Sequence, residues 1–187
     1  MCGIIGYIGP KNTTDVLLQG LRRLEYRGYD SAGIAVHENE QFYLAKEVGR
    51  VSELEKVVVQ GHDSGAGIAH TRWATHGGVT VENAHPHLSQ CAEVVLVHNG
   101  IVENASRLRE TLSESGIEFR SETDTETLVQ IIANFYRGKG PFGVQDFPVT
   151  KGDPFESIRH TLKIAHGTWG IAVMFRDRPN EIFAARN

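Results

Sequence analysis

Short apolar runs recur along the chain between glycine, proline and polar clusters, and this pattern predicts β-strands. The runs lie at residues 3–8, 31–36, 42–45, 67–69, 94–97, 169–175 and 181–184. The last two flank a polar turn at residues 177–180, which predicts a hairpin. The strands follow one another in groups and do not alternate strictly with helices. This order favours antiparallel sheets with helices packed on them over a doubly wound parallel sheet.

Leucines at helical spacing predict the first helix. Asn12 supplies a capping side chain, the leucines of residues 17–24 repeat on one face, and Gly28 marks the stop. Thr123 and Glu126 have the spacing of a capping box before a strongly apolar helix. Further helices are expected at residues 51–58, around Leu108 and Leu112 as far as Gly116, and around Phe155, Ile158, Leu162 and Ala165. Glycine and proline in residues 138–154 predict a long surface loop or insertion. Together, the predicted strands and helices indicate an α+β protein.

Length, charge and cysteine content narrow the class of protein. The 187 residues suit one domain over residues 1–187. A net charge of −4 argues against a nucleic-acid surface, and no stretch approaches the roughly 20 apolar residues that span a membrane. Two cysteines, Cys2 and Cys91, argue against a disulfide framework, so a reducing, cytoplasmic location is expected. Residues 182–187 stay apolar nearly to the last position, and we therefore expect a fragment of a longer protein.

Cys2 directly follows the initiator methionine and is the first candidate for chemistry. Removal of Met1 would leave a cysteine that carries a free α-amine. A thiol attacks as the thiolate, and an α-amine titrates near about 8, so this amine can accept the thiol proton near neutral pH. The structural alternative is a small apolar residue that opens a strand.

Two clusters in the first half of the chain place polar side chains at predicted element ends. Residues 26–33 are predicted to lead from the end of a helix into a strand. The structural explanation of Gly28 is that it ends the helix. Residues 70–78 lead from a strand into a glycine-flanked loop. Arg72 in this segment offers a planar fork for a carboxylate, with a surface ion pair as the alternative.

Two more clusters follow in the second half. Asn99 and Gly100 come after the predicted strand 94–97, and a side-chain amide beside a glycine N–H can form an oxyanion hole. Asn-Gly is also the commonest tight-turn dipeptide, so a hairpin stays open. Asp124 lies at a helix start, where an acidic side chain suits the helix dipole and could also hold a ligand ammonium.

Five histidines fall within one stretch and raise the question of a metal site: His70, His76, His85, His87 and His98. Their spacing matches no zinc pattern and no cysteine pair accompanies them, so no metal is expected. Residues 85–87 are expected to form a rigid loop with hydrogen-bonded imidazoles instead.

The clusters occur in one order, and together they resemble the glutaminase domain of class II glutamine amidotransferases over nearly the whole chain. The segments are Met-Cys-Gly-Ile-Ile-Gly, Tyr-Arg-Gly-Tyr-Asp-Ser-Ala-Gly, His-Thr-Arg-Trp-Ala-Thr-His-Gly, Asn-Ala-His-Pro-His, Val-His-Asn-Gly and Ser-Glu-Thr-Asp-Thr-Glu. Residues 26–33 and 70–77 look most like the hexosamine-forming branch. The resemblance implies an N-terminal nucleophile hydrolase fold, a four-layer αββα sandwich of two mainly antiparallel sheets.

The resemblance also implies a role for particular residues. Cys2 would attack the side-chain amide of L-glutamine, with Asn99 and Gly100 stabilising the oxyanion before water releases glutamate. The substrate-binding residues would be Arg72, Trp73, Thr75, His76 and Asp124, with Arg27 in a supporting role. Within this set Arg72 would hold the α-carboxylate, Asp124 the α-ammonium, and Trp73 would gate the ammonia exit. No cofactor and no metal is implied.

In the hexosamine-forming branch a C-terminal sugar isomerase half uses the ammonia to make glucosamine 6-phosphate from fructose 6-phosphate. That half is absent from this chain, and the resemblance implies no nucleic-acid or membrane partner. Two alternatives stay open: the glutaminase domain of another class II amidotransferase, and an unprocessed module that binds glutamine without cleaving it.

Overall fold

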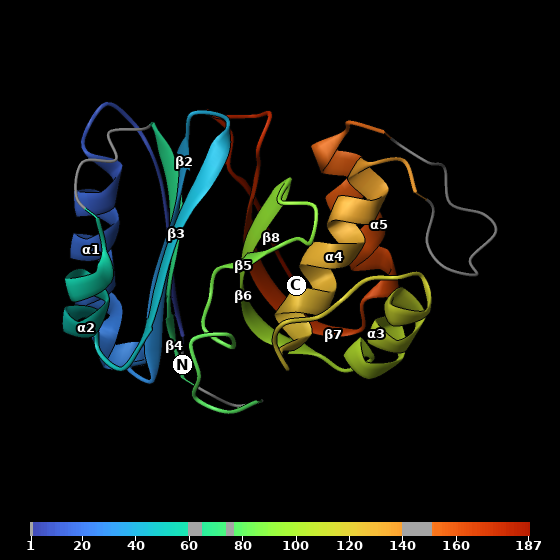
Figure 1. Ribbon diagram of the computed structural model, residues 1–187, viewed down its shortest axis with the longest axis horizontal. Coiled ribbons are helices and arrows are strands. Elements are labelled where there is room, and N and C mark those ends of the chain that lie inside the picture. The colour runs from blue at the N-terminus through green and yellow to red at the C-terminus, as the bar shows by residue number, and fades with distance from the viewer. Residues whose placement is uncertain (1, 60–64, 74–76, 140–150) are drawn as a thin grey trace.

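The chain folds into four layers, with two four-stranded sheets face to face and helices on both outer faces (Figure 1). The computed structural model describes residues 2–59, 65–73, 77–139 and 151–187. All strand pairs in both sheets are antiparallel. The predicted α+β sandwich of two antiparallel sheets is therefore confirmed.

The first sheet has the order β1-β4-β2-β3. Its strands are β1 (Gly3–Ile8), β2 (Ser31–Glu38), β3 (Gln41–Val48) and β4 (Ala66–Arg72). Helices α1 (Thr13–Leu24) and α2 (Val51–Val57) cover its outer face, and the 3₁₀ turn η1 (Glu25–Arg27) follows α1 (Figure 1). The Asn12 side chain accepts a hydrogen bond from the Asp15 amide at 3.0 Å, which is the predicted cap.

The second sheet has the order β5-β6-β7-β8. Its strands are β5 (His87–Leu88), β6 (Val94–Val102), β7 (Gly167–Phe175) and β8 (Phe183–Arg186). Helices α3 (Ala105–Glu114), α4 (Asp124–Tyr136) and α5 (Pro154–Ile164) cover its outer face (Figure 1). Thr123 caps α4 and Asp153 caps α5, each accepting from a backbone amide three residues on.

Apolar side chains fill the gaps between the layers. Leu17 and Leu21 of α1 pack on Ile34 of the first sheet, and the buried face of α4 packs on β6 and β7. Between the sheets lie Ile68, Val97 and Met174 with their neighbours. The period-2 and period-3.6 patterns of the sequence thus bury their apolar faces in these interfaces.

Some boundaries differ from expectation. Strand β6 continues to Val102, so Asn99 and Gly100 lie within a strand and neither end it nor form a hairpin. The expected last helix is α5, and Phe155 in its first turn is 64% exposed, because only one face of this helix meets α4. The predicted loop at 138–154 lies between α4 and α5, and its residues 140–150 are outside the described part. Among the described residues no helix is both long and apolar enough to span a bilayer.

Candidate functional site

Cys2 lies beside the end of β4. Strand β1 pairs with β4 so that Gly3 is opposite Thr71, and this register brings the residue before β1 next to Arg72 and Trp73. The Trp73 amide donates a hydrogen bond to Cys2 Sγ at 3.2 Å. The same sulfur lies 3.7 Å from the Trp73 carbonyl oxygen, so the Trp73 backbone fixes its position at the end of β4.

The amide of Asn99 reaches Cys2 from the opposite sheet. Its Nδ2 donates to the Cys2 carbonyl oxygen at 3.2 Å. Gly100, next along β6, has φ of +141°, and a Cβ there would lie 2.1 Å from the Thr168 carbonyl oxygen. Only glycine fits this position, because a side chain would be strained there and would clash with the backbone of β7.

Arg72 is the last residue of β4 and is 4% exposed. Its Nη1 donates to the Gly78 carbonyl at 3.1 Å. Burial lowers the pKa of the guanidinium, and the charges of Cys2, Asp30 and Asp124 oppose that shift. The group stays cationic, because arginine does not lose its proton in proteins. It is therefore a buried positive charge next to the thiol.

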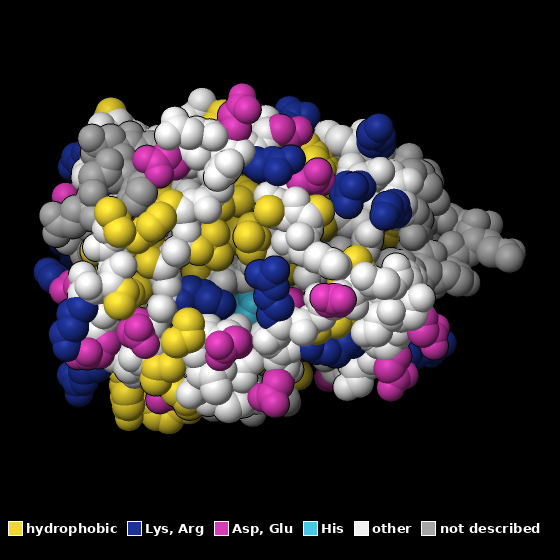
Figure 2. Space-filling model, in the orientation of Figure 1, with side chains coloured by type: hydrophobic (Ala, Val, Ile, Leu, Met, Phe, Trp, Pro, Cys, Tyr) yellow, Lys and Arg dark blue, Asp and Glu magenta, His cyan; other side chains and the backbone are white. Residues whose placement is uncertain are grey.

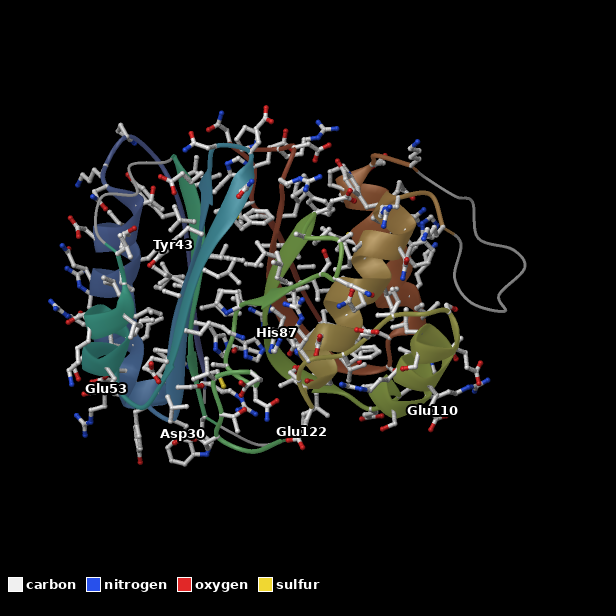
Figure 3. All side chains as sticks on the ribbon, viewed as in Figure 1. Asp30, Tyr43, Glu53, His87, Glu110 and Glu122 are labelled. Atoms are coloured by element: carbon white, nitrogen blue, oxygen red, sulfur yellow. The ribbon has the colours of Figure 1, made fainter. Side chains whose placement is uncertain are left out.

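Asp124 opens α4 and faces the same end of the sandwich. Its Oδ2 accepts the Val102 amide at 2.8 Å, while its Oδ1 lies 3.9 Å from His98 Nδ1. Figure 3 places Glu122, two residues earlier, and Asp30 at this end, with His87 between the sheets above them. The site thus places the positive side chain of Arg72, the negative side chain of Asp124 and the sulfur of Cys2 around one cavity.

A small cavity of about 40 Å³ lies at the centre of these residues. It is lined by Cys2, His70, Arg72, Trp73, His85, His98, Gly100, Thr123, Asp124 and Thr125. A wider hollow of about 220 Å³ shares Thr123 and Asp124 with it. In Figure 2 histidine surface is visible between lysine or arginine side chains near the middle of the face. Larger hollows near Arg176 are not lined by a cysteine, so side-chain chemistry and not volume selects the cavity at Cys2.

Buried histidines form the wall between the sheets, and sequence reasoning gave them no role in the site. The rings of His70 and His85 stack with centroids 4.2 Å apart. Burial lowers the pKa of His70 to about 4 and the pKa values of His85 and His87 well below 6.5. All three imidazoles are therefore neutral at physiological pH.

Threonine hydroxyls hold this histidine wall. Thr125 Oγ1 lies 2.8 Å from His85 Nε2 and 3.0 Å from His98 Nδ1, and Thr123 Oγ1 lies 3.1 Å from His87 Nε2. The hydrogen-bonded imidazoles expected at residues 85–87 are confirmed. The described residues contain no group of three or more histidine, cysteine or acidic side chains arranged to hold a metal ion. The signal that could have indicated the wall is the alternation of threonines at the start of α4, a segment interpreted from the sequence as a helix cap with an acidic residue for the helix dipole or a ligand ammonium.

The structure brings together most of the candidate residues. Cys2, Arg72, Trp73, Gly100 and Asp124 line one cavity, and Asn99 is hydrogen-bonded to Cys2. Arg27 does not line it. Arg27 is the last residue of η1. The next residue, Gly28, lies against the backbone of Arg72, since a Cβ at Gly28 would be 2.8 Å from it. The candidates Thr75 and His76 lie outside the described residues.

Comparison with known proteins agrees with this geometry. Residues 57–141 match the glutamine amidotransferase domain family. All 187 residues align at 48% identity with glutamine–fructose-6-phosphate aminotransferase [isomerizing] of Thermus thermophilus and at 43% with that of Bacillus subtilis. The chain is therefore similar to glutamine amidotransferases along its whole length. It spans 28% and 29% of the length of these two relatives.

Solved structures of amidotransferases share the fold. The glutamine phosphoribosylpyrophosphate amidotransferase of B. subtilis superposes with a TM-score of 0.77 over the whole chain and 37% of its own length, at 24% identity. An allosteric regulatory enzyme of purine biosynthesis gives 0.75 over 94% of this chain and 36% of its own, at 26% identity. The αββα sandwich of this chain is therefore the fold that these enzymes share.

Proposed function

We propose that residues 1–187 form one glutaminase domain that hydrolyses L-glutamine to glutamate and ammonia. The observation that carries the proposal is the convergence of four groups on the cavity. Cys2, Gly100, Arg72 and Asp124 line the cavity, and the Asn99 side-chain amide is hydrogen-bonded to Cys2. A thiol beside convergent N–H donors is the arrangement that acyl transfer requires.

The reaction begins at Cys2 after removal of Met1. The thiol proton passes to the free α-amine, Sγ bonds to the amide carbon, and the oxygen of the tetrahedral intermediate receives the N–H groups of Asn99 and Gly100. Collapse expels ammonia, which takes the proton from the α-amine. Water then attacks the thioester, releasing glutamate and restoring the thiol.

Arg72 and Asp124 give the site its preference for an amino acid. Arg72 pairs with the α-carboxylate and Asp124 with the α-ammonium, so glutamine is held at the end remote from the scissile amide. Thr75 and His76, which follow Arg72 closely in the sequence, would assist in holding glutamine. Trp73, 44% exposed, would separate the cavity from the ammonia exit. Arg27 supports the segment that backs Arg72.

In the longer protein we propose that the ammonia serves glucosamine 6-phosphate synthesis from fructose 6-phosphate. The support is 42–48% identity to glutamine–fructose-6-phosphate aminotransferases over the full chain. A sugar isomerase half, absent here, would be the partner that receives the ammonia. The reaction would take place in the cytoplasm and would need no cofactor.

The test is the intact mass of the purified chain before and after 6-diazo-5-oxo-norleucine, a glutamine-shaped electrophile. We expect a starting mass that lacks one methionine, then a single adduct that maps to Cys2. Cys2→Ala should take no label, whereas Cys91→Ala should label as the parent chain does, since Cys91 lies outside the cavity.

Other outcomes separate the alternatives. Loss of Met1 without a label at Cys2, and without glutamate release from glutamine, would favour a glutamine-binding module and refute the proposal. Hydrolysis of glutamine by this chain, combined with an acceptor other than fructose 6-phosphate for the longer protein, would leave the glutaminase activity standing and assign it to another class II amidotransferase.

A further inference from the structure

The oxyanion-hole amide of Asn99 has a second partner on its other side. His70 Nε2 lies 2.8 Å from Asn99 Oδ1 and 3.1 Å from the His98 carbonyl oxygen. His70 belongs to β4 of the first sheet, whereas Asn99 belongs to β6 of the second. The contact therefore joins the two sheets directly behind the nucleophile.

The two acceptors determine which nitrogen of His70 carries the proton. A carbonyl oxygen can only accept, so the Nε2 that faces the His98 carbonyl must donate. A neutral imidazole has one N–H, so Nδ1 is bare, and Nδ1 has no hydrogen-bond partner among the described residues. Burial keeps the ring neutral, with a pKa of about 4. The tautomer is thus set by the backbone of β6.

This tautomer in turn determines the orientation of the Asn99 amide. An N–H from His70 requires an oxygen opposite it, so Oδ1 points to His70 and Nδ2 points to Cys2. The Cys2 carbonyl, which accepts from Nδ2 at 3.2 Å, requires the same orientation. A flipped amide would place oxygen against the Cys2 carbonyl and nitrogen against the His70 N–H, leaving both contacts repulsive.

We infer that His70 is a positioning residue that holds the Asn99 amide with its N–H group directed at the reacting oxygen. The inference rests on the proposed glutaminase function. His70 acts through Asn99. When substrate arrives and the oxyanion competes with the Cys2 carbonyl for Nδ2, the hydrogen bond from His70 is the contact that keeps the amide from rotating. Preorganised donors of this kind stabilise the transition state and not the bound substrate.

The test compares two substitutions of His70. His70→Leu removes the donor while filling the space, and His70→Gln retains an N–H near the position of Nε2. Because loss of a whole oxyanion donor costs about 10²–10³ in kcat, we expect His70→Leu to lower kcat for glutamine by about 10- to 100-fold. KM should change less than about threefold. His70→Gln should recover kcat to within a few-fold of the parent value.

His87→Leu is the matched control. It also removes a buried imidazole from the histidine wall, but its Nε2 contacts Thr123 and not Asn99. Its kcat should stay near that of the parent chain. The rate of Cys2 alkylation by iodoacetamide, which forms no oxyanion, should be unchanged in His70→Leu when measured in a Cys91→Ala background. This readout reports folded, reactive sites and separates misfolding from misorientation.

The outcomes test the role of His70 separately from the proposed glutaminase function. A parent chain that hydrolyses glutamine, with His70→Leu unimpaired or with His70→Gln as impaired as His70→Leu, overturns the role of His70 alone. An equal loss of kcat in His87→Leu does the same. A parent chain that has lost Met1 and releases no glutamate overturns the proposed function, and the inference with it.

Discussion

The buried neutral histidines His70, His85 and His87 should make the stability of the folded chain sensitive to acid. Burial lowers the pKa of His70 from 6.5 to about 4 in the native state. Between these values the unfolded chain binds a proton that the native chain does not, so the contribution of His70 to stability is complete above pH 6.5 and is lost as the pH falls towards 4. At pH 5.0, 1.5 units below 6.5, the loss is about 2 kcal/mol. His85 and His87 act in the same direction because burial lowers their pKa values too.

Urea unfolding followed by circular dichroism at pH 7.5 and pH 5.0 measures this loss of the free energy of unfolding. The parent chain should lose stability between the two conditions. In His70→Gln the difference between the two free energies of unfolding should be smaller by about 2 kcal/mol, since one of the titrating groups is gone. His166→Gln is the control, because His166 is exposed and only its backbone takes part in the hydrogen bonds described for it. It should keep the parent difference.

A His70→Gln chain whose loss of stability between pH 7.5 and pH 5.0 equals that of the parent would contradict this account of His70. The His70 ring would then already be protonated in the native state near pH 5, or would not titrate on unfolding. Imidazole ¹⁵N shifts of the folded parent chain at pH 5.0 give an independent check. They should show His70 neutral with its proton on Nε2.

Three further predictions follow from single contacts. Gly33→Ala should destabilise the chain by about 2–3 kcal/mol in urea unfolding, because its Cβ would lie 2.2 Å from the His85 carbonyl oxygen, whereas Gly170→Ala, with its nearest neighbour at 3.8 Å, should cost under about 1 kcal/mol. Burial lowers the pKa of Lys46 from 10.5 to about 8, so between these pH values Lys46 is protonated in the unfolded chain only, and the free energy of unfolding of the parent should rise by roughly 3 kcal/mol. In Lys46→Met this rise should be absent. Tyr136→Phe should cost about 2 kcal/mol in the same assay, because the hydroxyl donates to the Asp177 carboxylate at 2.7 Å.

Much of the fold follows from local pattern. The run 3–8 is bounded by glycines, and the structure places β1 over those residues. The capping signals at Asn12 and Thr123 mark the starts of α1 and α4 to within a residue, because a cap side chain and the first free amides determine each other over one turn. Such signals act over a few residues and are therefore visible in a sequence.

The true extent of β6 was not predictable from such signals. Asn99-Gly100 is the sequence of a tight turn, yet it lies in a strand because pairing with β7 continues to Val102. Cross-strand hydrogen bonds with residues about 70 positions away decide this, and no local propensity reports them. The same applies to the exposure of Phe155, which depends on where α4 lies.

The site could be predicted as a set of residues but not as an arrangement. Cys2, Arg72, Asn99 and Asp124 come from the start of one strand, the end of another, a strand of the second sheet and a helix start. Each had an ordinary structural explanation, and their shared order along the chain carried the functional prediction. Their meeting at one cavity depends on the packing of the two sheets, which the sequence does not express locally.

The chemistry of the histidine wall explains how a polar site can lie between two apolar sheets. A neutral imidazole offers one donor and one acceptor, so His70, His85 and His98 can each hydrogen-bond to neighbouring polar atoms without adding charge. Lysine or carboxylate side chains in the same places would each need a buried counter-charge. With the wall uncharged, Arg72 and Asp124 supply the opposite charges at the cavity. In the proposed function that pair binds the carboxylate and ammonium of glutamine, and an uncharged wall would leave both charges unscreened for this substrate.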